Sequence, residues 1–125
     1  DGGLSSGWFV APTLLADVTQ DMPSARTEVF GPVQSVLAFD DLDEAVRIAN
    51  DTSYGLSAGV FTADLGRAHR LAAALQAGQV QINRYTGAGV EVPFGGYKQS
   101  GIGREKGMDA LLHYSQVKSV IVDLH

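Results

Sequence analysis

The feature that most constrains the fold is a regular alternation of apolar and amphipathic segments. Three short, mostly apolar segments alternate with two segments that repeat apolar side chains at helical spacing, in the order 33–39, 42–50, 58–61, 65–75 and 79–82. This strand–helix–strand–helix–strand order predicts an α/β fold, βαβαβ, with a parallel sheet and right-handed crossovers. Ligand sites in such sheets lie beyond the carboxyl ends of the strands. Residues 83–105 follow the last of these strands, so a site is expected there.

Polar residues mark the expected helix ends. Asp41 precedes the first helical segment and Glu44 follows three residues later, which is the pattern of a capping box. Asp64 is expected to cap the second helix and Gly78 to end it. Outside this alternation we expect an extended edge segment at 8–15, a loop at 17–26, a short helix at 108–113 and a last strand at 115–124.

Composition limits the classes of function. The 125 residues fit one domain, and 45% apolar with 18% charged residues is typical of a globular protein. A net charge of −5 without a basic cluster argues against nucleic-acid and membrane partners. The chain has no cysteine, which excludes disulfides and thiol chemistry within it. It begins without methionine in the polar residues 1–7, and we therefore expect a piece of a longer protein.

Two segments carry the residue types of a binding site. In Glu28-Val-Phe-Gly-Pro32, the carboxylate of Glu28 can accept two hydroxyl hydrogen bonds while the ring of Phe30 packs on a flat ligand. The alternative is a solvent-facing loop Glu and a core Phe. In Pro93–Glu105, the glycines allow positive φ or a close approach of another segment, and Phe94 suits an apolar pocket. Here the alternative is a core Phe that anchors a long loop.

The polar half of the second segment comprises Lys98, Ser100, Arg104 and Glu105. Arg104 offers a planar set of donors that suits carboxylates or backbone carbonyls. One interpretation of Arg104 and Glu105 is a structural ion-pair network that fixes the loop against a neighbouring subunit. No metal site is expected. The acidic residues lack calcium-loop spacing and the histidines lack zinc-site spacing; the acidic residues are Asp40, Asp41, Asp43, Glu44 and Asp51, and the histidines are His69, His113 and His125.

The segment Pro93-Phe-Gly-Gly-Tyr-Lys-Gln-Ser-Gly-Ile-Gly-Arg-Glu105 resembles the C-terminal signature of the aldehyde dehydrogenase superfamily. The resemblance also includes Glu28–Pro32 and spans nearly the whole chain, from Gly7 through Leu124. It implies an oxidoreductase that oxidises an aldehyde to a carboxylic acid with NAD or NADP through a cysteine thioester. The nucleophilic cysteine and most of the cofactor domain would lie upstream. By itself this chain would then be an inactive C-terminal portion.

The resemblance also assigns roles to residues. Glu28 would bind the nicotinamide-side ribose hydroxyls, Phe30 would pack near the nicotinamide ring, and Phe94 would line the aldehyde tunnel. Glu105 would be a proton acceptor near that tunnel. Many relatives carry an aromatic residue where this chain has Ala88, which favours a wider or differently shaped pocket.

The same resemblance implies an organisation. Residues 1–114 would belong to the catalytic domain without its cysteine segment, and residues 115–125 would form a bridging strand. That strand would join subunits into a homo-oligomer, a dimer or tetramer, in the cytoplasm. Two alternatives stay open. One is a non-catalytic module that pairs with a full-length relative, and the other is an acyl-CoA- or phosphate-dependent branch of the superfamily.

Overall fold

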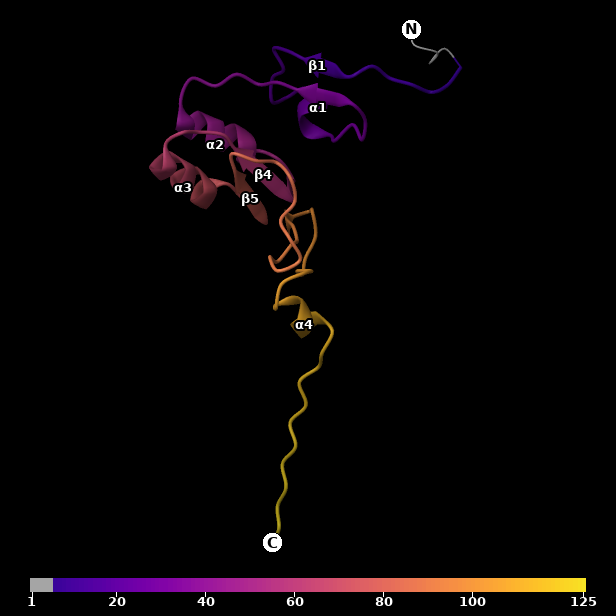
Figure 1. Cartoon of the computed structure of the whole chain (residues 1–125), viewed down its shortest axis with the longest axis vertical. Helices are drawn as coiled ribbons and strands as arrows, with labels where there is room; N and C mark the ends of the chain where they lie inside the picture. The colour runs from indigo at the N-terminus through magenta and orange to yellow at the C-terminus, as the bar shows by residue number, and fades with distance from the viewer. Residues whose placement is uncertain (1–5) are drawn as a thin grey trace. The chain divides into compact units, whose positions relative to one another are not determined.

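The computed structural model describes residues 6–125, which fall into two compact units, 6–52 and 53–125 (Figure 1). Helices and strands mix in both units, and each unit contains one parallel strand pair, so the predicted α/β class is confirmed. Residues 1–5 of the predicted N-terminal loop lie outside the described part. Among residues 6–125, no helix has the length and apolar character needed to span a bilayer.

The first unit is built on the parallel pair of β1 (Thr13–Leu15) and β2 (Val33–Ser35), with Thr13 opposite Val33. The segment between them was expected to be a loop, but it contains the short helix α1 (Pro23–Arg26). Proline is favourable in the first turn of a helix because its missing N–H needs no partner there. The strand predicted over 33–39 is three residues long, because its regular pairing with β1 ends at Ser35.

Helix α2 (Leu42–Asn50) begins at the predicted cap. The Glu44 backbone N–H donates to Asp41 Oδ1 at 2.8 Å, and the Asp40 N–H donates to Glu44 Oε2 at 2.9 Å. The Glu44 side chain thus returns to the residue before the cap rather than to the cap itself. The first bond satisfies a backbone donor of the first helical turn, and the second satisfies the N–H of the residue before the cap.

The second unit contains the parallel pair β4 (Ser57–Val60) and β5 (Gln79–Ile82), joined through α3 (Leu65–Ala74). Helix α3 packs on both strands, and its Ala68 is 1% exposed. The predicted cap is confirmed, since the Arg67 N–H donates to Asp64 Oδ1 at 2.9 Å. The predicted strand–helix–strand–helix–strand order is present as β2, α2, β4, α3 and β5. The predicted single parallel sheet is not, because among residues 6–125 β2 pairs with β1 and β4 pairs with β5. A third pair is antiparallel and joins β3 (Tyr54–Gly55) to β6 (Tyr97–Lys98).

Gly78 has a different role from the one predicted. Helix α3 ends at Ala74, and its C-cap Leu75 has an extended backbone. Gly78 lies four residues beyond the helix end and directly precedes β5. A Cβ at Gly78 would lie 1.8 Å from the carbonyl oxygen of Gly95. Gly78 is therefore required by a close backbone contact with the glycine-rich segment and not by the end of the helix.

The last described elements are α4 (Ala110–His113) and residues 115–125, which form neither helix nor strand. The short helix predicted over 108–113 is confirmed in its second half. The strand predicted over 115–124 has no pairing in this structure, and its apolar side chains are exposed; Val117 is 95% and Ile121 94% exposed. A strand is defined by its hydrogen-bonded partner, and no other described segment of the chain supplies one.

Buried apolar side chains are few. Among residues 6–125, Val18, Val60 and Ala68 are the buried ones, whereas Trp8 and Ile102 are fully exposed. Large apolar surfaces of this kind mark contacts with other protein parts.

Candidate functional site

An antiparallel bridge between Phe94 and Glu105 closes the glycine-rich segment on itself. The Phe94 N–H donates to the Glu105 carbonyl at 2.7 Å, and the Glu105 N–H donates to the Phe94 carbonyl at 2.7 Å. Residues directly opposite in an antiparallel pair project their side chains to the same face. The bridge therefore brings together the two residues predicted at the aldehyde tunnel, although eleven positions separate them in the sequence.

The glycines inside this loop are needed mainly for close contacts. A Cβ at Gly95 would lie 2.4 Å from the Gly103 carbonyl oxygen, and a Cβ at Gly96 would lie 2.6 Å from Ser100 Cβ. Positive φ occurs instead at Gly101 and Gly103, with φ of +119° and +86°. The predicted need for glycine is thus confirmed, with close approach in the first half of the loop and left-handed backbone in the second.

The loop leaves the carboxyl end of β5 through Asn83, in agreement with the expected location. The Thr62 N–H donates to Asn83 Oδ1 at 2.8 Å, and Asn83 Nδ2 donates to the Thr62 carbonyl at 2.9 Å. Asn83 itself has a φ of 55°, a conformation that asparagine tolerates better than most residues. These two bonds join the chain ends that follow β4 and β5, so they fix the direction in which the loop starts.

Arg104 binds backbone carbonyls rather than carboxylates. Its Nη1 donates to the Gly96 oxygen at 3.0 Å and to the Gly103 oxygen at 2.7 Å, and the guanidinium lies 5.5 Å from the centre of the Tyr97 ring. Neither ion pair found among residues 6–125 includes Arg104 or Glu105, so the proposed ion-pair network is not formed within this chain. Arg104 instead fixes the loop internally.

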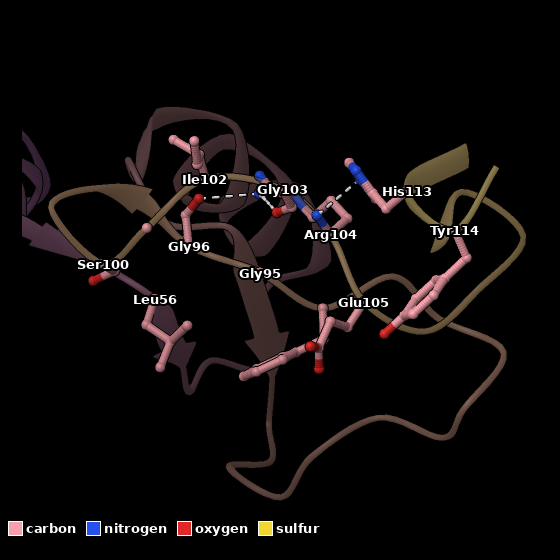
Figure 2. A pocket seen from close by; sticks show the side chains of 12 residues that line it. Leu56, Gly95, Gly96, Ser100, Ile102, Gly103, Arg104, Glu105, His113 and Tyr114 are labelled. Carbon is pink, nitrogen blue, oxygen red and sulfur yellow. Dashed lines mark hydrogen bonds between the residues drawn. The ribbon is translucent and has the colours of Figure 1, made fainter. Parts of the chain in front are cut away.

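These residues line a pocket of about 470 Å³ in the second unit, which we call the glycine-loop pocket (Figure 2). Its lining consists of Leu56, Phe94, Gly95, Gly96, Ser100, Gly101, Ile102, Gly103, Arg104, Glu105, His113 and Tyr114. The Ser100 hydroxyl accepts a hydrogen bond from the Gly55 N–H at 2.9 Å, which ties the pocket to β3. The sequence reasoning missed His113 and Tyr114, because they come from α4 and the residue after it and carry no motif of their own.

The predicted cofactor residues lie in the first unit. Glu28 is exposed, and Phe30 is 91% exposed with a φ of 52°. A bulky residue in left-handed backbone is strained, and such strain gathers at binding sites. The turn that follows is closed by a bond from the Val33 N–H to the Gly31 carbonyl at 2.8 Å. Phe30 is therefore not buried among the described residues of this chain.

The local support of this loop comes from Arg26, two residues before Glu28. The Arg26 guanidinium donates to the Asp51 carbonyl oxygen at 2.9 Å and to Asp51 Oδ2 at 2.9 Å. Gln20 Nε2 also donates to Asp51 Oδ2, at 2.9 Å. Sequence reasoning had not singled out these residues, because their partners are up to 31 positions apart.

Among residues 6–125, no three His, Cys, Asp or Glu side chains are grouped so as to hold a metal ion.

Comparison with known proteins places the chain in a family. The sequence model of the aldehyde dehydrogenase family matches residues 1–120. The chain belongs to the aldehyde dehydrogenase family. A betaine aldehyde dehydrogenase of Brucella anthropi is 58% identical over 122 residues, which cover 98% of this chain and 25% of that protein. A betaine aldehyde dehydrogenase of Brucella melitensis is 57% identical over the same shares.

Solved aldehyde dehydrogenases have the same fold. The Mycobacterium tuberculosis aldehyde dehydrogenase complexed with NAD+ is 40% identical, with a TM-score of 0.92 over 99% of this chain and 26% of that one. The P. syringae indole-3-acetaldehyde dehydrogenase AldA, in complex with NAD+ and IAA, is 50% identical, with a TM-score of 0.88 over 93% of this chain and 23% of that one. The chain thus spans about a quarter of the length of the aldehyde dehydrogenases that it matches.

Proposed function

We propose that this chain is the C-terminal part of an aldehyde dehydrogenase that converts an aldehyde, oxidised NAD or NADP and water into a carboxylic acid, the reduced cofactor and a proton. The observation that carries the proposal is the Phe94–Glu105 bridge. It places an apolar ring and a carboxylate on one face of a pocket, within a chain whose family oxidises aldehydes. The NAD+ complexes of two structural relatives support NAD as the cofactor.

In this proposal the chain binds and orients the reactants, and a cysteine on another part of the polypeptide is the nucleophile. The exposed Glu28 carboxylate accepts hydrogen bonds from two ribose hydroxyls, and Phe30 packs against the nicotinamide side of the cofactor. The bound cofactor supplies the hydride acceptor. Phe94 excludes water from the aldehyde, while Glu105 accepts a proton from water near the pocket. The isolated chain lacks a nucleophile, and we expect it to be inactive.

The decisive experiment replaces Glu28 by Gln in the natural polypeptide that contains this chain. Hydrogen bonds to a charged acceptor contribute about 1.5–3 kcal/mol, so the KM for NAD should rise at least about tenfold. Asp43→Asn is the matched control, because it removes an exposed carboxylate from α2 in the same unit. An unchanged KM for NAD in Glu28→Gln would refute the role of Glu28.

Residues 115–125 support a second part of the proposal, namely assembly of a homo-oligomer, a dimer or tetramer, through this bridging strand. The segment is rich in β-branched residues, exposed throughout and unpaired within the described chain. An unpaired apolar strand of this kind readily pairs with another chain. Deleting residues 115–125 should reduce the native mass measured by light scattering to that of a monomer. An unchanged native mass would refute the assignment.

The same exposed segment favours the alternative of a non-catalytic module that pairs with a full-length relative. The mass of the natural polypeptide separates the two proposals. An immunoblot band several times heavier than 13.2 kDa supports the enzyme, and a single band at 13.2 kDa supports the module. For the enzyme we also propose a cytoplasmic location, which fractionation of the source cells tests directly.

A further inference from the structure

His113 contacts the loop that carries the proposed substrate residues. The backbone N–H of Arg104 donates to His113 Nε2 at 3.2 Å, from the glycine-rich segment to the last residue of α4 (Figure 2). A ring nitrogen that accepts a hydrogen bond carries no proton. The bond therefore requires a neutral imidazole with its proton on Nδ1, and protonation of Nε2 abolishes it.

This hydrogen bond lies next to the bridge that positions the pocket residues Phe94 and Glu105. Arg104 directly precedes Glu105, whose N–H and carbonyl both bond to Phe94. Gly101 and Gly103, just before Arg104, have positive φ, and glycine restricts its own backbone least. The Gly103–Arg104 peptide, which carries the Arg104 N–H, is therefore held in part by hydrogen bonds from outside these glycines. His113 supplies one from a helix outside the loop.

We propose that neutral His113 is a positioning residue for substrate binding, which fixes the Gly103–Arg104 peptide and, through the bridge at Glu105, the ring of Phe94. This inference rests on the proposed function, since it makes Phe94 part of the aldehyde site. Protonation converts His113 Nε2 from an acceptor into a donor, which then faces the Arg104 N–H, a second donor. The hydrogen bond is lost, and the affinity of the glycine-loop pocket for the aldehyde falls as the pH falls.

The charged and titratable groups that share the pocket with His113 are Arg104, Glu105 and Tyr114, from the loop and from the end of α4. The Arg104 guanidinium donates to the carbonyl groups of Gly96 and Gly103. Loss of the acceptor at His113 Nε2 therefore removes the loop support that comes from α4.

Two variants of the natural polypeptide test the proposal. His113→Gln keeps an acceptor at similar reach, in its side-chain carbonyl, but does not titrate in this range. His113→Ala removes the acceptor. The matched control is His69→Gln, which changes an exposed histidine on α3. The KM for propionaldehyde, at saturating NAD, is measured between about pH 5.5 and 8.5, a range that spans the ordinary histidine pKa of about 6.5.

The natural protein and His69→Gln should share a KM that is higher at the acid end of this range than at its alkaline end. His113→Ala should have a KM raised about fivefold at pH 8, the effect of one hydrogen bond, and no further rise in acid. His113→Gln should match the natural KM at pH 8 and stay flat. The proposal is overturned if His113→Ala has the same KM as the natural protein at pH 8. It is also overturned if the KM of His113→Gln still rises in acid.

A second readout separates this inference from the proposed function, because it needs no turnover. Deuterium exchange of peptides that cover residues 103–105, measured at pH 8, should be faster in His113→Ala than in the natural protein and His113→Gln. Equal exchange in all three overturns the role of His113. Faster exchange in His113→Ala, together with no oxidation of propionaldehyde by the natural protein, supports the bond and refutes only the proposed function.

Discussion

The contact between Gly78 and Gly95 leads to the sharpest prediction about stability. A Cβ added at Gly78 would lie 1.8 Å from the Gly95 oxygen, 2.8 Å from the Gly95 carbonyl carbon and 3.3 Å from Gly96 Cα. Ordinary contacts lie near 3.5 Å, so the two backbones must separate by roughly 1.5 Å. All three neighbours are backbone atoms, and no side-chain rotation can relieve the overlap.

The free-energy change follows from the bonds beside this contact. The Gly78 N–H donates to the Gly55 carbonyl at 2.9 Å, and the Gln79 N–H donates to the Leu56 carbonyl at 3.2 Å. Losing each costs about 1 kcal/mol, and the overpacking itself costs about 1–3 kcal/mol. Gly78→Ala should therefore lower the free energy of unfolding by about 3–5 kcal/mol.

Urea denaturation of the natural polypeptide, followed by tryptophan fluorescence and circular dichroism, measures this change. For a slope of about 3 kcal/mol per molar urea, the midpoint should fall by about 1 M or more. Gly87→Ala is the matched control, because its Cβ meets nothing within 4 Å and its φ is not in the left-handed range. If Gly78→Ala and Gly87→Ala share one midpoint, the close contact does not carry the stability assigned to it.

Two further predictions concern the network and the cap. Arg26→Ala should lower the free energy of unfolding by about 1 kcal/mol in the same urea experiment, because two bonds to Asp51 are lost at a partly exposed site, and Arg26→Lys should recover only part of it. The Arg67 backbone N–H lowers the pKa of Asp64 below its usual 3.8. The cap is thus fully present above pH 3.8 and is lost as the pH falls through the lower folded-state pKa; amide protection of Arg67, followed by NMR, should decline there but not in Asp64→Asn.

Local patterns predicted α2 and α3 but not α1. Asp41 and Asp64 act as caps, and Glu44 bonds back to Asp40, because these bonds lie within a few residues, where spacing in the sequence fixes geometry. The strand over 79–82 was also predicted with its correct bounds. The prediction that Gly78 ends the helix was wrong. Glycine is required there by a contact with Gly95, seventeen positions away, and helix-end patterns include only neighbouring residues.

The sequence indicated part of the candidate site, but neither its connections nor the contributions of His113 and Tyr114. The motif identified Phe94 and Glu105, yet only the folded chain shows that both backbone bonds of a bridge join them. Arg104 was expected to suit carboxylates or backbone carbonyls, and within the described residues it bonds to the carbonyl groups of Gly96 and Gly103. The ion-pair network against a neighbouring subunit stays a prediction. Whether Glu28 and Phe30 bind a cofactor stays a prediction.

The distribution of burial supports the proposed place of this chain within a larger enzyme. The proposed site residues are positioned by short-range bonds, such as the bridge at Phe94 and the Arg26 contacts before Glu28. These bonds form without a large core. The apolar side chains, in contrast, mostly face outward, with Trp8 and Ile102 fully exposed and Phe30 91% exposed. Each exposed apolar side chain favours burial by about 1.5–3 kcal/mol. This chain positions its proposed site residues by local bonds but leaves its apolar side chains uncovered. Such a chain is suited to packing against further protein, as in family members about four times as long.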